Sequence, residues 1–162
     1  MNEHQPAFAI TFIIASVTAS VAALGVVITG SGENYWYSSL VKPAFNPPDL
    51  AFQVVWPVLF GLMALSAVVV RIKAGSYGVA RPALLLYFLQ LGINLAWSWL
   101  FFGFHLLGVA LGTLVLLWMV VVLMIRAFAR YSTTAAVLQV PYFLWISFAA
   151  YLNATILMLN AS

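Results

Sequence analysis

The chain of 162 residues is 65% hydrophobic and only 6% charged, and its mean hydropathy is +1.10. Soluble domains carry charge on about a quarter of their residues, so this composition excludes a water-soluble globular protein and makes lipid the expected solvent. The absence of cysteine excludes disulfides and thiol catalysis. The net charge of +3 comes from scattered basic residues, so no nucleic-acid partner is expected.

Five apolar segments follow one another along the chain, and each is long enough to cross a bilayer. They comprise residues 8–28, 51–70, 82–102, 106–127 and 135–159. About 20 helical residues cross a ~30 Å hydrocarbon core, and backbone groups in lipid must be satisfied within the segment. Period-two alternation, the barrel pattern, is absent. The predicted fold is an all-α integral membrane protein, a bundle of five transmembrane helices that fills residues 1–162 as a single domain.

The positions of the basic residues predict the orientation in the membrane. If all five segments span, five basic residues share the side of the N-terminus: Arg71, Lys73, Arg81, Arg126 and Arg130. Lys42 alone lies on the other side. Positive charge stays cytoplasmic, so in a bacterial inner membrane the N-terminus is inside and the first loop and the C-terminus are outside. The start of the chain has no basic residue, which favours a retained first span over a cleaved signal.

The first loop, residues 29–50, is predicted to be a long extramembrane lid. Together with the start of the second span it holds Trp36, Trp56 and a group of prolines around Lys42. This stretch is too long for a minimal connector and too aromatic for a solvated linker. We therefore expect it to pack over part of the bundle.

The third span contains a pair of amides beside an aromatic strip. Gln90 and Asn94 are four residues apart and share a helix face, and Trp97 and Phe101 continue near that face. The pair has two interpretations: interhelical hydrogen bonds, worth ~0.6 kcal/mol on average, or the polar part of a ligand site. No charged residue lies deep in a span, which counts against an ion-coupled carrier.

The fifth span carries a second aromatic face. Tyr142, Trp145 and Ala149 follow one another at helical spacing, and the small alanine leaves room beside the indole. Pro141 removes a helical hydrogen bond, so a kink is expected near it. Trp56 and Trp145 both lie inside their spans, where interfacial anchoring explains them less well.

Other chemistry has little support in the sequence. His4 and His105 lie in no metal-binding pattern, so no metal site is expected, and His105 is read as a solvated turn residue rather than a haem ligand. Hydrolase motifs, a phosphate loop and paired carboxylates are missing. The Gly108–Gly112 spacing fits either packing inside the bundle or a homodimer face.

Several dispersed motifs together resemble the translocator protein/tryptophan-rich sensory protein family (TspO), as a bacterial-type member, over residues 36–160. The matches are Trp36-Tyr37, Leu40, Lys42-Pro43, Phe45, Pro47-Pro48, Phe52, Trp56, Asn94, Trp97, Phe101-Phe102-Gly103, Pro141-Tyr142, Trp145, Phe148-Ala149 and Leu152-Asn153. Their number and order make the resemblance specific.

The resemblance implies a five-helix membrane protein, often a homodimer, that binds protoporphyrin, haem and drug-like aromatic molecules in a cavity capped by the first loop. No cofactor is required. Asn94 is implied to hydrogen-bond a ligand carbonyl, and Trp56 and Trp145 are implied to line the cavity and to act in light- and oxygen-dependent porphyrin breakdown. The ligand-binding residues expected on this basis are Asn94, Trp56, Trp145, Trp97, Ala149, Tyr37, Pro47, Gln90 and Phe101. Lys42 is expected to meet a propionate at the mouth.

Sterol binding and transport are two further functions to weigh against the sequence. Residues 152–160 lack the aromatic and basic residues of the C-terminal cholesterol motif of animal members, so sterol binding there is not expected. A transporter of porphyrins or other small amphipathic molecules is the alternative function, and a packing subunit is a third. The missing intramembrane charge and the missing inverted repeat count against ion-coupled transport.

Overall fold

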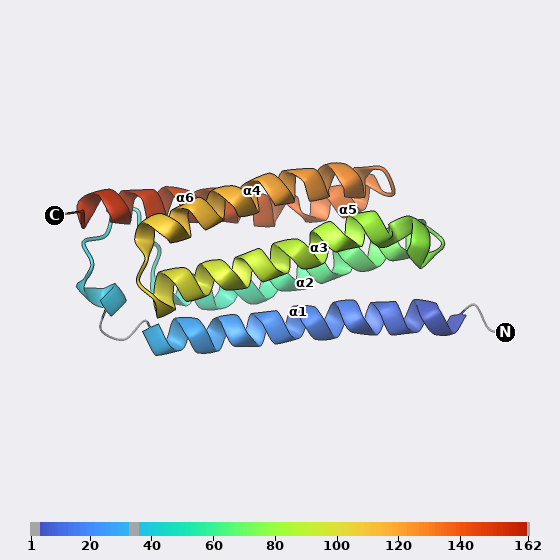
Figure 1. The fold of residues 1–162 in the computed structure, drawn as a ribbon, viewed down its shortest axis with the longest axis horizontal. Coiled ribbons are helices and arrows are strands. Elements are labelled where there is room, and N and C mark those ends of the chain that lie inside the picture. The colour runs from blue at the N-terminus through green and yellow to red at the C-terminus, as the bar shows by residue number, and fades with distance from the viewer. Residues whose placement is uncertain (1–3, 33–35, 162) are drawn as a thin grey trace.

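The structure, a computed structural model, describes residues 4–32 and 36–161 and is built from helices packed side by side (Figure 1). In chain order the helices are α1 (His4–Gly32), α2 (Asp49–Lys73), α3 (Tyr77–Ser98), η2 (Trp99–Gly103), α4 (Leu107–Ala129), α5 (Thr133–Leu138) and α6 (Val140–Leu159). Residues 33–35 of the predicted loop 29–50 lie outside the described residues.

Within these ranges, five stretches are long and apolar enough to cross a membrane. They are Phe8–Gly30, Leu50–Lys73, Tyr77–Gly103, Leu107–Ala129 and Thr133–Leu159. The prediction of an all-α bundle of five spans is therefore confirmed, and the chain is an integral, multi-pass membrane protein. The observed third span begins five residues before the predicted boundary at residue 82, because α3 starts at Tyr77.

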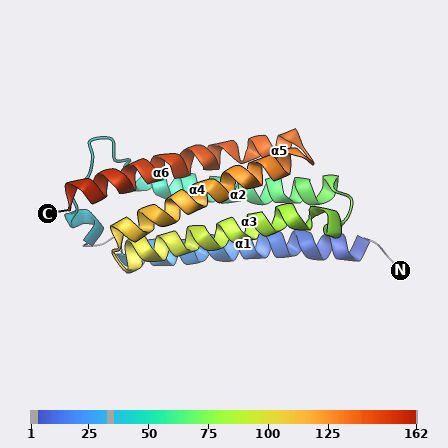
Figure 2. The ribbon, with the colours of Figure 1, turned by 45° about the horizontal axis from the view of Figure 1, so that its top comes forward.

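The helices run along the long axis of the molecule, with α1 and α6 on opposite sides of the bundle (Figures 1 and 2). Helix α1 packs against α2 and α3, while α4 packs against both α3 and α6. The end of α6 and residues 36–48 lie at one end of the bundle, and the start of α1 lies at the other (Figure 1). The short α2–α3 and α4–α5 connections lie at the end of the bundle where α1 begins (Figure 1). The basic residues Arg71, Lys73, Arg81, Arg126 and Arg130 lie in these connections or in the helix turns beside them.

Serine caps organise those two connections. The hydroxyl oxygen of Ser76 accepts a hydrogen bond from the backbone N–H of Val79, and Ser132 does the same for Ala135. Each cap satisfies one of the backbone donors that a helix start leaves without a partner. Gly75 precedes the first cap with a φ of 75°, a left-handed conformation that glycine adopts without steric cost. Local sequence thus makes the turns tight at this end.

The fifth span is interrupted by a single turn residue. Its predicted range, 135–159, is divided at Gln139 into α5 and α6, and Pro141 lies in the first turn of α6. At that position the missing proline N–H would have had no helical acceptor, so the residue starts a new helix without loss of a bond. The expected kink near Pro141 is thus observed as a break two residues earlier.

The third span ends in a wider π-helical turn, where the sequence predicted ordinary helix up to residue 102. The N–H of Phe104 donates to the carbonyl of Trp99 at 2.8 Å, five residues back. The Trp99 indole covers Gly103, where a Cβ atom would lie only 2.8 Å from the ring. His105 follows with a φ of 59°, so the chain reverses sharply into α4.

Neutral polar side chains join the helices inside the bundle. The hydroxyls of Thr18 in α1 and Tyr87 in α3 are 2.6 Å apart, and Ser66 in α2 donates to the carbonyl of Ala135 at 2.6 Å. Asn153 in α6 donates to the carbonyl of Leu107 at the start of α4. Because lipid offers no hydrogen-bond partner, each buried group needs one from a neighbouring helix or from its own.

The Gly108–Gly112 pair does not bring two helices of the described bundle into close contact. A Cβ atom added at either glycine would meet no other atom within 4 Å. The pair therefore does not serve close helix packing inside the described bundle, which was one of the two interpretations of this motif.

Candidate ligand-binding site

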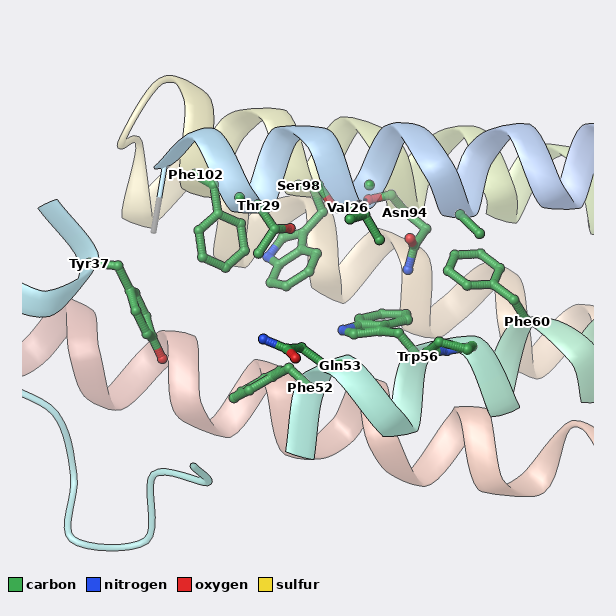
Figure 3. A pocket seen from close by; sticks show the side chains of 15 residues that line it. Val26, Thr29, Tyr37, Phe52, Gln53, Trp56, Phe60, Asn94, Ser98 and Phe102 are labelled. Carbon is green, nitrogen blue, oxygen red and sulfur yellow. Dashed lines mark hydrogen bonds between the residues drawn. The ribbon is translucent and has the colours of Figure 1, made fainter. Parts of the chain in front are cut away.

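A cavity of about 440 Å³ lies between α1, α2 and α3 (Figure 3). Its lining comprises Ala22, Gly25, Val26, Thr29 and Gly30 from α1, Tyr37, then Phe52, Gln53, Trp56, Pro57 and Phe60 from α2, Asn94, Trp97 and Ser98 from α3, and Phe102 from η2. Mostly apolar and aromatic walls with a few polar groups are typical of small-molecule sites.

Trp56 is the centre of the aromatic wall. Its ring centroid lies 5.7 Å from that of Phe60, 6.4 Å from that of Trp97 and 6.3 Å from that of Trp145. These separations fall in the range in which aromatic pairs attract one another beyond simple burial. The indole of Trp56 is consequently held in place on three sides while it still faces the cavity.

Asn94 supplies the polar group on the α3 wall. Its amide nitrogen donates to the hydroxyl of Tyr142 in α6 at 3.1 Å, and Tyr142 is fully buried. In Figure 3 the side chains of Asn94 and Trp56 project toward one another across the cavity. Because Tyr142 fixes the Asn94 side chain, that amide presents its remaining hydrogen-bonding capacity in a set orientation.

Gln53 supplies a second polar group, from α2, and sequence reasoning did not identify it. It lies on the cavity wall beside Phe52 (Figure 3). Sequence reasoning also missed the α1 wall. A signal was present there, because Ala22, Val26 and Thr29 recur at helical spacing and place small or β-branched residues on one face.

Residues 36–48 lie at the end of the bundle where α6 ends, and we refer to them as the lid segment (Figure 1). Tyr37 lines the cavity, and its hydroxyl donates to the Asn46 side-chain oxygen at 3.1 Å. The Lys42 ammonium lies 4.1 Å from the centroid of the Tyr37 ring, a cation–π contact. Trp36 stacks on His105, with centroids 4.0 Å apart, which joins the lid segment to the α3–α4 turn.

A second, smaller cavity of about 30 Å³ adjoins the first, and it contains two of the predicted residues, Phe101 and Ala149. Four side chains line both cavities, namely Tyr37, Phe52, Trp97 and Phe102. The Trp97 indole N–H donates to the Asn153 side-chain oxygen at 3.4 Å, which ties this ring to α6.

Three predicted residues line neither cavity. Trp145 lies behind the wall, edge-on to Phe52 and Trp56. Gln90 is fully buried one turn deeper than Asn94 and contacts the Met63 sulfur at 3.7 Å. Pro47 belongs to the lid segment, where its carbonyl accepts a hydrogen bond from Asn46. The structure therefore brings Trp56, Asn94, Trp97 and Tyr37 together at the main cavity and sets the other predicted residues around it.

Gln139, at the break between α5 and α6, is a buried amide without a partner among the described residues. Its side chain is fully buried, and neither of its polar atoms has a hydrogen-bond partner there. We expect Gln139→Met to raise the free energy of unfolding by about 1–2 kcal/mol, because it removes two unsatisfied groups while it keeps most of the volume. Thermal unfolding in detergent micelles measures the change.

A matched control for this prediction is Val137→Leu, which changes a lipid-exposed residue two positions away. We expect no shift in its unfolding midpoint. A lower midpoint for Gln139→Met would show that the amide contributes net stability and would contradict the prediction.

Comparison with known proteins relates the whole bundle to one family. A family model described as the TspO/MBR family matches residues 12–159. The chain is 41% identical over 141 residues to the tryptophan-rich protein TspO of Chlorobaculum tepidum, covering 87% of this chain and 89% of that protein. It is 38% identical to a tryptophan-rich sensory protein of Cereibacter sphaeroides, with 77% of each chain covered. It is 37% identical to the translocator protein of Sus scrofa, with 74% of this chain and 71% of that protein covered.

Proposed function

This chain belongs to the TspO/MBR family, and on that premise we propose that it is a membrane receptor for tetrapyrroles, such as protoporphyrin and haem, and for drug-like aromatic molecules. Family membership supports the membrane receptor role, and the class of ligand is our proposal. It takes the cavity between α1, α2 and α3 as the binding site.

The observation that carries the proposal is the composition of the cavity wall. Aromatic rings of Trp56, Phe60, Trp97 and Phe102 surround a space of about 440 Å³, and Asn94 projects into it. A flat aromatic ligand gains by stacking on indole and phenyl faces. One amide of fixed orientation is enough to set how a carbonyl-bearing ligand lies on them.

We propose that the lid segment lies on the outer side of the membrane. The basic residues in and beside the α2–α3 and α4–α5 connections gather at the opposite end of the bundle, which the positive-inside rule assigns to the cytoplasm. The cavity would then open toward the outer half of the bilayer, where Lys42 is the basic residue nearest to a ligand carboxylate.

A titration with protoporphyrin IX tests the proposed function. The purified protein in detergent micelles should show saturable quenching of tryptophan fluorescence and a shifted porphyrin Soret band, because Trp56 and Trp97 line the cavity. Micelles without protein provide the baseline for porphyrin partitioning. Quenching that rises linearly with porphyrin and never saturates would contradict a receptor role.

We further propose that Trp56 takes part in light- and oxygen-dependent breakdown of a bound porphyrin. Trp56 faces the cavity and lies close to two other indoles, those of Trp97 and Trp145. In this arrangement Trp145 acts behind Trp56 rather than in contact with the ligand. Illumination of the porphyrin complex with and without dioxygen tests the activity. If Trp56→Phe and the unmodified protein lose porphyrin at the same rate, Trp56 takes no part in the breakdown.

A further inference from the structure

We propose that Asn160, directly after α6, is a positioning residue that clamps the lid segment over the cavity. Its side-chain oxygen accepts a hydrogen bond from the backbone N–H of Val41 at 3.0 Å. Its side-chain nitrogen donates to the carbonyl of the same Val41, also at 3.0 Å. One carboxamide thus satisfies both backbone groups of a residue 119 positions away in the chain.

The chemistry of this contact is specific to a carboxamide. Only asparagine and glutamine side chains offer an N–H donor and a carbonyl acceptor side by side, as a peptide group does. Asn160 is itself held at the end of its helix, because its side-chain nitrogen also donates to the carbonyl of Ile156 at 2.8 Å. The last turn of α6 therefore supplies a fixed point to which the lid segment is attached.

The clamp is connected to the cavity through the lid segment. Lys42 follows Val41 directly, and its ammonium lies 4.1 Å from the centroid of the Tyr37 ring. Tyr37 lines both cavities, whereas Asn160 lines neither. Asn160 therefore acts on a ligand only through the position of the lid segment, and this inference rests on the proposed function of the cavity.

Loss of the clamp is expected to change the rate of ligand exchange more than the affinity. The bonds between Asn160 and Val41 are exposed, so their removal should raise the open fraction of the lid segment about three- to tenfold. Since Asn160 does not touch the ligand site, association and dissociation should accelerate by similar factors. The ratio of the two rates, and hence the dissociation constant, should change less than about twofold.

The first measurement concerns the ligand-free protein. We expect the Val41 amide to exchange its hydrogen about three- to tenfold faster in Asn160→Ala, and similarly in Asn160→Asp, which places a carboxylate beside the Val41 and Ile156 carbonyls. Thr155→Val is the matched control, because the Thr155 hydroxyl donates to the carbonyl of Tyr151 in its own helix. Exchange that accelerates in the last turn of α6 while Val41 stays protected would reveal helix fraying and overturn the clamp.

The second measurement follows protoporphyrin IX by stopped-flow tryptophan quenching. The proposal predicts a parallel rise of both rate constants in Asn160→Ala and unchanged rates in Thr155→Val. Faster Val41 exchange with unchanged porphyrin kinetics would overturn the positioning role. Absence of saturable porphyrin binding by the unmodified protein would instead reject the proposed function, and the exchange at Val41 would still decide whether the clamp exists.

Discussion

Replacement of Trp56 by alanine should weaken protoporphyrin binding by about thirtyfold, the largest effect expected from any single residue of the cavity. Trp56 lies at the centre of the aromatic wall, in contact with the rings of Phe60, Trp97 and Trp145. Truncation of a central, enclosed aromatic residue typically costs ~2 kcal/mol of binding energy, which corresponds to this factor. Fluorescence titration of the variant in micelles measures it.

Two companion variants show whether the loss comes from the stacking surface. Trp118→Ala removes an indole that lines neither cavity and donates instead to Ser147, so its affinity for protoporphyrin should stay within about twofold of the unmodified protein. Trp56→Phe keeps an aromatic ring at the cavity wall, so its affinity for protoporphyrin should fall only a few-fold. Equal losses in Trp56→Ala and Trp118→Ala would point to general destabilisation and would contradict the assignment of the cavity wall.

The fold was predictable because the bilayer imposes it. Span lengths and hydropathy alone predict the five helices that the structure shows. The length and aromatic content of the first loop predict that it packs over part of the bundle. The details of the local departures from straight helices were less predictable. The π-helical turn places the Trp99 ring against Gly103 in the same turn, and hydrophobic periodicity does not encode this change in hydrogen bonding. Pro141 predicts a kink, but periodicity does not indicate that the interruption falls at Gln139.

The candidate site was predictable only in part, for a similar reason. The motifs identified Trp56, Asn94, Trp97 and Tyr37, all of which line the main cavity. They could not show that Ala149 would line the smaller cavity rather than the main one. The α1 wall was harder still, because Ala22 and Val26 look like ordinary span residues until the packing of α1 on α2 and α3 is known.

The second large effect concerns Asn94, which has a role in folding as well as in the proposed binding. Asn94→Leu leaves the buried Tyr142 hydroxyl without the donor that lies 3.1 Å away in the native structure. An unsatisfied buried hydroxyl costs about 1–3 kcal/mol, so the unfolding midpoint should fall. Affinity for a carbonyl-bearing aromatic ligand should fall about tenfold, the worth of one well-placed hydrogen bond.

The double variant Asn94→Leu/Tyr142→Phe separates these two roles. Removal of both partners of a buried hydrogen bond leaves no orphan group, so the double variant should be about 1–2 kcal/mol more stable than the sum of the single changes implies. Its ligand affinity should stay as low as that of Asn94→Leu, because Tyr142 does not line the cavity. Recovery of stability without recovery of binding is the expected result. Strictly additive changes in the free energy of unfolding would show that the Asn94–Tyr142 bond does not couple the two helices. Full ligand affinity in Asn94→Leu would show that Asn94 does not contact the ligand.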